Sequence, residues 1–222
     1  MRPVNKGEAP DVIFRKYQDA LPYLEKRIGV YCSFCEFHIQ HVPEVEHREA
    51  KSQGGEELEW KNLLLSCKYC NTRKGTIVKA GDGEKYLWPD RDDTFHAFSY
   101  SEDIPKLNEE YLATVDADTR DKAKNLYGIL KLNNIPVSPK DKDRRYLARS
   151  EARNQALLSR KGWEKIKHTS ERELFFQQII MLAKATGFFS VWMEIFKCDK
   201  EIMFGLVNAF EGTRKELIGE VT

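Results

Sequence analysis

The stretch that decides the fold runs from Cys32-Ser-Phe-Cys35 to Cys67-Lys-Tyr-Cys70-Asn-Thr-Arg-Lys-Gly75. Two C-x-x-C pairs can present four thiolates to one tetrahedral ion, and such a closed set leaves no open position. The spacing therefore predicts a structural zinc on Cys32, Cys35, Cys67 and Cys70. The alternatives are two unrelated pairs of buried thiols, or a redox C-x-x-C, which would need a β-α-β setting and only one pair.

The residues between the two pairs predict a hairpin packed on one short helix. Val42 and Val45 indicate a short strand that ends near Glu46-His47, and Gly54-Gly55 allows the chain to turn. Leu63-Leu64-Leu65 is the expected return strand. Ser66 is expected to cap the helix that follows, and Gly75 to end it.

The segment from Cys32 to Lys74 resembles the HNH nuclease motif, the ββα-metal finger, in its cysteine-flanked form. The features that carry the resemblance are both cysteine pairs, the Glu46-His47 pair, the Gly-Gly turn, Asn62 before the return strand, and Asn71 with Lys74 after the last cysteine. The resemblance implies hydrolysis of phosphodiester bonds.

It also implies roles for single residues. His47 would be the general base, since histidine can accept a proton from water near neutral pH. Glu46 and Asn71 would offer oxygen ligands to a catalytic Mg²⁺ or Mn²⁺, separate from the zinc. Asn62 would brace the hairpin and help to orient His47. Glu46 stands where the wider family often has Asp, and Asn71 where it often has His, so the preferred metal stays open.

Candidate contacts to nucleic acid are basic residues. Lys74 is expected three residues after Asn71 on the same helix face, and Arg145, Arg149 and Arg153 on one face of a later helix. A solvated face paired with acidic residues is the alternative for the three arginines. Arg73 and Lys51 complete the set, although Lys51 can equally be a loop charge. His38 and His41 follow no acid and are read as surface or hairpin residues.

The predicted fold class is α+β and mostly α, with the zinc-clipped finger embedded in a largely helical chain. Helices are expected over 11–28, with Asp11 as N-cap and a bend at Pro22, and then over 118–132, 142–166, 170–187 and 199–210. The expected division is an N-terminal helical segment (1–30), the finger (31–76), an irregular connector (77–105) and a C-terminal helical domain (106–222).

Composition sets limits on function. The 222 residues carry 36 basic and 35 acidic side chains, a net charge of +1, so no global basic field indicates a nucleic-acid partner. The charge is uneven, with net −8 over 82–121 (4 − 12) and +6 over 140–168 (10 − 4). The sequence shows no signal peptide, and Phe175–Met193 is too polar for a membrane span, so a cytoplasmic location is expected. Cys198 is expected to be a packed free thiol.

More widely, the chain is similar to the HNH subunit of two-component bacterial anti-phage systems, Septu-type or retron-associated. The start Met1-Arg2-Pro3-Val4, the run from Glu46 to Lys51, and Leu130-Lys131-Leu132-Asn133 carry this likeness. It implies an effector nuclease in complex with an SMC/ABC-like ATPase, in retron systems together with the reverse transcriptase and its RNA-DNA product. DNA is the default substrate. The alternatives are an RNA- or tRNA-cleaving effector, a stand-alone restriction-type nuclease, and a zinc-finger binding module without chemistry.

The helical half is rich in large aromatic side chains. We expect that helices over 170–210 dock onto a partner protein, the ATPase if the likeness holds, because aromatics are enriched at interface centres. An ordinary aromatic-rich core is the alternative. The residues concerned are Trp163, Phe175, Phe176, Phe188, Phe189, Trp192, Phe196, Phe204 and Phe210.

Overall fold

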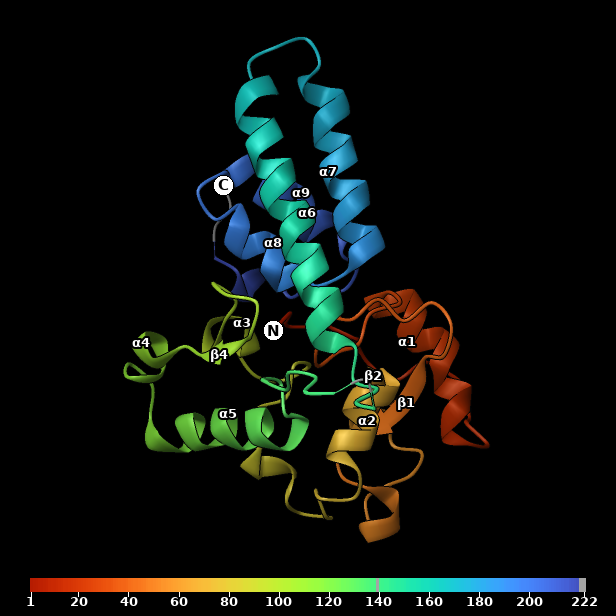
Figure 1. The fold of residues 1–222 in the computed structure, drawn as a ribbon. Coiled ribbons are helices and arrows are strands. Elements are labelled where there is room, and N and C mark those ends of the chain that lie inside the picture. Colours follow the sequence, from red (N-terminus) through yellow and green to blue (C-terminus); the bar gives the residue numbers. More distant parts are fainter. Residues whose placement is uncertain (139, 220–222) are drawn as a thin grey trace.

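The computed structural model describes residues 1–138 and 140–219, and it is mostly helical with two small sheets (Figure 1). The α+β, mostly α class predicted from the sequence is confirmed. The strands are β1 Glu44–His47, β2 Leu63–Ser66, β3 Phe98–Ser99 and β4 Lys106–Leu107. The helices are α1 Leu21–Ile28, α2 Lys68–Lys74, α3 Thr94–Ala97, α4 Glu109–Leu112, α5 Ala117–Leu130, α6 Arg145–Ile166, α7 Arg172–Thr186, α8 Phe189–Ile195 and α9 Lys200–Ala209.

The finger consists of β1, β2 and α2. The strands pair antiparallel, with Val45 opposite Leu65 and His47 opposite Leu63. Every residue of β2 is buried, which explains its continuous apolar run. Cys67, rather than the predicted Ser66, is the N-cap of α2, and Gly75 ends the helix with a φ of 51° that favours glycine.

The first predicted helix is shorter than expected. A 3₁₀ turn at Tyr17–Ala20 precedes α1, and Asp11 caps nothing. Pro22 lies in the first turn of α1, where a backbone N–H has no partner in the helix, so it starts the helix instead of bending it.

The C-terminal helices lie close to their predicted places, but α8 was missed. The chain changes direction at Gly187 and Phe188, which both have positive φ angles, and α8 follows at once. Almost every residue of α8 is buried. A helix covered on all sides has no polar face, so the 3.6-residue pattern that reveals most helices is absent.

The finger and the helical half share their packing. Residues from both halves belong to one apolar cluster that extends from Met1 to Val191. Glu36, one residue after the first cysteine pair, accepts hydrogen bonds from Ser190 N at 2.8 Å and Ser190 Oγ at 2.6 Å. Phe188 N donates to Glu36 O at 2.9 Å, and Phe37 forms a bridge with Gly187. The first turns of α8 are therefore anchored on the finger.

Two details of the helical half differ from expectation. Cys198 is exposed, so the prediction of a packed thiol is wrong; it lies between the ends of two helices, where solvent reaches it. Most of the aromatic side chains fill the core, and among those singled out Phe204 alone is exposed. The abundance of aromatics is thus explained by packing. Within the described residues, no helix has the length and apolarity that a bilayer crossing requires.

Candidate active site

The four cysteines meet in the interior. All four are buried, and their sulfur atoms lie within 4.8 Å of one another. Cys35 Sγ is 3.6 Å from Cys67 Sγ. Tetrahedral zinc with Zn–S bonds of about 2.3 Å requires sulfurs roughly 3.8 Å apart, so this donor set fits the ion.

Backbone geometry presents the two pairs to each other. The first pair closes in a tight turn, in which Glu36 N donates to Cys32 O at 2.9 Å and Glu36 takes a φ of 66°. Ser33 N donates to Leu65 O at 2.8 Å, which ties this turn to β2. The second pair sits on the first turn of α2, one residue beyond β2.

The thiols of Cys32, Cys35 and Cys67 shift one another's pKa values. Burial raises the pKa of Cys35, while hydrogen bonds from neighbouring thiols lower the pKa of Cys32 against the effect of its own burial. Hydrogen bonds to the other thiols raise the pKa of Cys67. Metal ions bind thiolates, so a metal ion bound at this cluster would displace the protons that Cys35 and Cys67 hold.

Arg145 lies directly against this cluster. Its Nη1 is 3.4 Å from Cys70 Sγ and donates to Leu130 O at 2.9 Å. Its Nη2 donates to Asp143 at 2.8 Å. Arg145 is 2% exposed, so the prediction that it contacts nucleic acid is wrong. Its burial and its bonds make it a support for the cysteine cluster.

The other predicted phosphate contacts also have partners in the chain. Arg149 is 1% exposed and donates to Asp103 O at 3.3 Å, so it too lies away from any surface. Arg153 donates to Tyr100 O at 3.2 Å, and Arg73 lies 3.8 Å from Asp143. Burial excludes Arg149 as a phosphate contact, whereas Arg153 and Arg73 keep partial exposure.

His47 ends β1 and is 6% exposed. Its Nε2 lies 3.0 Å from Glu57 O, and its ring meets the edge of Tyr17 at a centroid distance of 4.8 Å. A carbonyl oxygen only accepts hydrogen bonds, so Nε2 carries the hydrogen and Nδ1 keeps a lone pair in the neutral ring. Burial lowers the pKa of His47, which favours that neutral, proton-accepting form.

Glu46 points to the other side of β1, toward α2. Its carboxylate pairs with Lys74 Nζ at 2.7 Å, and both side chains are almost fully buried. Burial raises the pKa of Glu46, and Lys74 works against that rise. Lys74, predicted as a phosphate contact, is 0% exposed and pairs with Glu46, so in this structure its ammonium does not face a substrate.

Asn71 contacts Glu44, a functional candidate that was not predicted from the sequence. Its Nδ2 donates to Glu44 at 2.6 Å, and Lys68 Nζ lies 3.1 Å from the same carboxylate. Glu44 lies two residues before Glu46 and shares its strand face, so strand periodicity was the signal that could have found it. Two carboxylates and one amide oxygen are a donor set that suits Mg²⁺ or Mn²⁺.

Asn62 fixes the loop between the strands. Its Nδ2 donates to Glu49 O at 3.0 Å and to Glu56 O at 2.8 Å, and its Oδ1 accepts from Glu49 N at 2.8 Å. The loop closed in this way carries Glu57, whose carbonyl oxygen holds His47. Asn62 therefore acts on His47 through the backbone, not by touching it.

The remaining candidates from the sequence, Lys51, His38 and His41, lie outside the group formed by Glu46, His47 and Asn71. Lys51 pairs with Glu57 at 2.7 Å and lies over the Tyr17 ring at 4.4 Å, with 43% of its side chain exposed. His38 hydrogen-bonds to Ala185 O at 2.8 Å, while His41 is exposed. Lys51 is thus the basic candidate that stays accessible beside His47.

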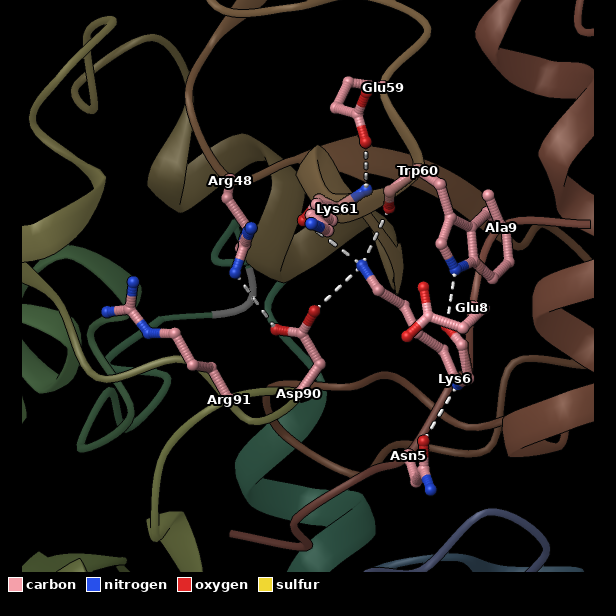
Figure 2. Close-up of a pocket in the computed structure, with 11 residues that line it drawn as sticks. Asn5, Lys6, Glu8, Ala9, Arg48, Glu59, Trp60, Lys61, Asp90 and Arg91 are labelled. Carbon is pink, nitrogen blue, oxygen red and sulfur yellow. Dashed lines mark hydrogen bonds and ion pairs between the residues drawn. The ribbon is translucent and has the colours of Figure 1, made fainter.

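A cavity of about 340 Å³ lies next to the finger (Figure 2). At its wall Lys6 Nζ bonds to Trp60 O at 2.9 Å, Leu63 O at 2.7 Å and Asp90 at 2.8 Å. Arg48, which follows His47, lies 3.7 Å from Asp90. These contacts anchor the start of β2 to the N-terminal segment and so help to fix the position of the strand that pairs with His47.

Comparison with protein families agrees with this geometry. Residues 32–76 match the family described as HNH endonuclease. Comparisons with curated proteins and with solved structures give no match. The chain thus contains an HNH endonuclease domain with a four-cysteine cluster that can bind metal.

Proposed function

We propose that this protein is a metal-dependent endonuclease that hydrolyses phosphodiester bonds, with DNA as its first substrate. The observation that carries the proposal is the arrangement of His47. Its Nε2 is held by Glu57 O, and its Nδ1 is left as a proton acceptor on a ring whose pKa is lowered by burial. A zinc-binding module without chemistry needs no such oriented base.

Each of these residues has a separate role in the proposed hydrolysis. Nδ1 of His47 takes a proton from a water molecule, whose oxygen attacks phosphorus while the bond to the leaving sugar oxygen breaks. Glu46 and Asn71, with Glu44 beside them, would hold the divalent ion. When bound, that ion polarises the phosphoryl group and stabilises the leaving oxygen. Lys74, on α2, fixes the side chain of Glu46, on β1, through their ion pair.

The test is cleavage of plasmid DNA and of structured RNA, each with Mg²⁺ or Mn²⁺, by zinc-loaded protein. His47→Ala should abolish cleavage. Because His47 is buried, His47→Gln is tested beside it to keep the packing on Tyr17. His41→Ala, at an exposed histidine six residues away, is the matched control and should cleave like the wild type. Wild-type cleavage by both His47 variants would exclude His47 as the base.

One observation favours a second candidate, a nucleic-acid-binding module without catalysis. The Glu46 carboxylate already has a buried cation, Lys74, at 2.7 Å. If that pair persists with substrate, Glu46 does not reach a metal ion. DNA binding by the wild type without cleavage in any divalent metal would favour this candidate.

We further propose that the chain acts in the cytoplasm as the effector subunit of a bacterial anti-phage system with an SMC/ABC-like ATPase. The likeness of its start and of the Glu46–Lys51 run to such subunits supports this proposal. Co-expression with an ATPase encoded next to it tests the partnership. Co-purification supports it, and a chain that purifies alone from such co-expression contradicts it. Cleavage of RNA alone, in the assay above, would assign the tRNA-directed alternative.

A further inference from the structure

An unusual face runs along the outer side of α7. Its central positions are Leu174, Gln177, Gln178, Met181 and Ala185, which we call the α7 stripe, and all five are exposed. Leu174 is 67% and Met181 71% exposed, in the range of charged surface side chains. Shallow apolar grooves of about 540 and 550 Å³ lie along the stripe. Two large apolar side chains this exposed on one helix face indicate an interface.

Packing against α6 and α9 prevents α7 from rotating about its axis, so the stripe cannot become buried in the core of the same chain. Glycines on both neighbouring helices let α7 pack closely: a Cβ at Gly162 of α6 would lie 2.6 Å from Phe175, and one at Gly205 of α9 would lie 2.6 Å from Phe176. Phe175 and Phe176 thereby fix the rotation of α7. Figure 1 shows α6 and α7 as a hairpin that extends away from the finger, with α7 at the edge of the molecule.

Four of the five stripe positions are symmetric about the point between residues 177 and 178, whereas Ala185 has no counterpart within α7. Leu174 and Met181 are equally far from this midpoint, one on each side, and the two glutamines flank it. A two-fold axis perpendicular to the helix at this point brings each residue to the level of the one at the same distance on the other side, and it brings the residues next to the axis close to their own copies. We propose that the α7 stripe is the interface of a homodimer, in which α7 of two copies packs antiparallel about such an axis.

The charges at the ends of α7 support this occupant. Glu171 and Glu173 lie at its N-terminal end, where Arg172 between them is paired with Glu201 of α9, and Lys184 lies at its C-terminal end; Glu171, Glu173 and Lys184 are all exposed. Antiparallel pairing brings the two acids of one copy to the level of Lys184 of the second copy, at both ends. Among the described residues, Lys184 forms no ion pair within its own chain. Parallel pairing would instead place like charges side by side.

The centre of the stripe also suits two-fold packing. Gln177 Nε2 already donates to Glu173 Oε1 at 3.0 Å within the helix, so Gln178 is the residue expected to pair with its own copy across the axis, because an amide both donates and accepts hydrogen bonds. Phe204 of α9, 56% exposed and part of the same groove as Met181, adds apolar contact at the side. The α7 stripe and Phe204 together would bury less surface area than a typical stable interface, so we expect a dissociation constant of the dimer on the order of 10 µM.

The dimer leaves the finger free, because the hairpin projects away from it (Figure 1). The inference therefore does not depend on the proposed nuclease activity, and nuclease variants such as His47→Gln should dimerise normally. Sedimentation equilibrium of the zinc-loaded full chain, without nucleic acid, is the readout. Leu174→Lys with Met181→Lys should weaken dimerisation at least about hundredfold. Ile13→Lys, at a still more exposed apolar residue outside the stripe, is the control and should change nothing.

A charge exchange tests the antiparallel direction. Lys184→Glu, and separately Glu171→Lys with Glu173→Lys, should each weaken dimerisation about tenfold through repulsion between the copies. The triple exchange restores opposite charges and should recover dimerisation. In a parallel dimer the triple exchange would recover nothing.

A disulfide tests the position of the axis. In a Cys198→Ser background, Gln178→Cys should form an interchain disulfide on mild oxidation, because the two copies of residue 178 face each other at the axis. Ile13→Cys in the same background should not. A chain that stays monomeric at several hundred micromolar, or a dimer that survives the double lysine variant, overturns the proposal. Binding of a different protein through Leu174 and Met181 by a monomeric chain would assign the stripe to that partner and equally overturn it.

Discussion

At the scale of single residues, two lysines on α2 pair with two glutamates on β1, yet their surroundings differ. Lys74 and Glu46 are 0% and 8% exposed, whereas Lys68 and Glu44 are 71% and 20% exposed. Removing one member of a buried pair leaves an uncompensated charge away from water, while an exposed pair is screened. The same chemistry thus contributes differently at positions six residues apart on one helix.

Lys74→Met should therefore lower the free energy of unfolding by roughly 3 kcal/mol, since Glu46 loses its partner and its pKa rises further. Lys68→Met should change it by less than about 1 kcal/mol. Urea denaturation of the zinc-loaded variants measures both. Glu46→Gln with Lys74→Met should recover part of the loss, and equal losses for the two lysine variants would contradict the burial argument.

At the scale of elements, the finger is two four-residue strands and one short helix. Such a hairpin and helix bury too little apolar surface to be stable alone. The cysteine cluster ties the turn before β1 to the start of α2, so the metal should fix the relative positions of all three elements. His47, Asn62 and Asn71 depend on those positions.

We expect one zinc ion per chain, measured by elemental analysis of the purified protein. Removal of the metal, or Cys67→Ser, should abolish the cooperative thermal transition of the finger, because metal binding supplies folding free energy. Cys198→Ser is the matched control, since Cys198 is exposed and outside the cluster, and it should keep its zinc and its transition. A fully folded chain without zinc would refute the structural role of the cluster.

At the scale of the whole molecule, the finger and the helical half are held together by buried polar groups. Arg145, on the first turn of α6, bonds to Asp143, to the end of α5 at Leu130 and to the sulfur of Cys70. Glu36 bonds to Ser190 of α8 from the finger side. The start of α6 and the start of α8 are therefore fixed to the cysteine cluster.

Arg145→Ala should lower the free energy of unfolding by roughly 3 kcal/mol and accelerate zinc release to a chelator, because Asp143 and the carbonyl oxygens lose their donor. Arg153→Ala removes an arginine two turns further along α6, which is 20% exposed, and should change stability by less than about 1 kcal/mol. Denaturation and the rate of zinc transfer to a colorimetric chelator measure the effects. Similar zinc release in the two variants would show that Arg145 does not support the cluster.

Local signals were sufficient for the finger. The two C-x-x-C pairs, the glutamate-histidine pair and the leucine run predicted the cysteine cluster, the hairpin and the helix within a residue or two, because chain connectivity over such short spacing leaves few arrangements. The same holds for α5, α6, α7 and α9, whose apolar periodicity follows from one buried face.

Where each charged side chain lies was decided by tertiary structure. By their spacing, Arg145 and Arg149 looked like a surface row. Both are buried, because Arg145 contacts Cys70 and the end of α5 at Leu130, and Arg149 contacts Asp103 O and the ring of Phe188. Lys74 looked like a phosphate contact and became the partner of Glu46, while Glu44 met Asn71 only through the packing of α2 on β1. The sequence by itself determined the cysteine cluster that can bind metal and the places of the finger, α5, α6, α7 and α9, since these depend on neighbours along the chain. Burial, ion pairing and the exposed α7 stripe depend on contacts between distant residues, which only the folded chain brings together.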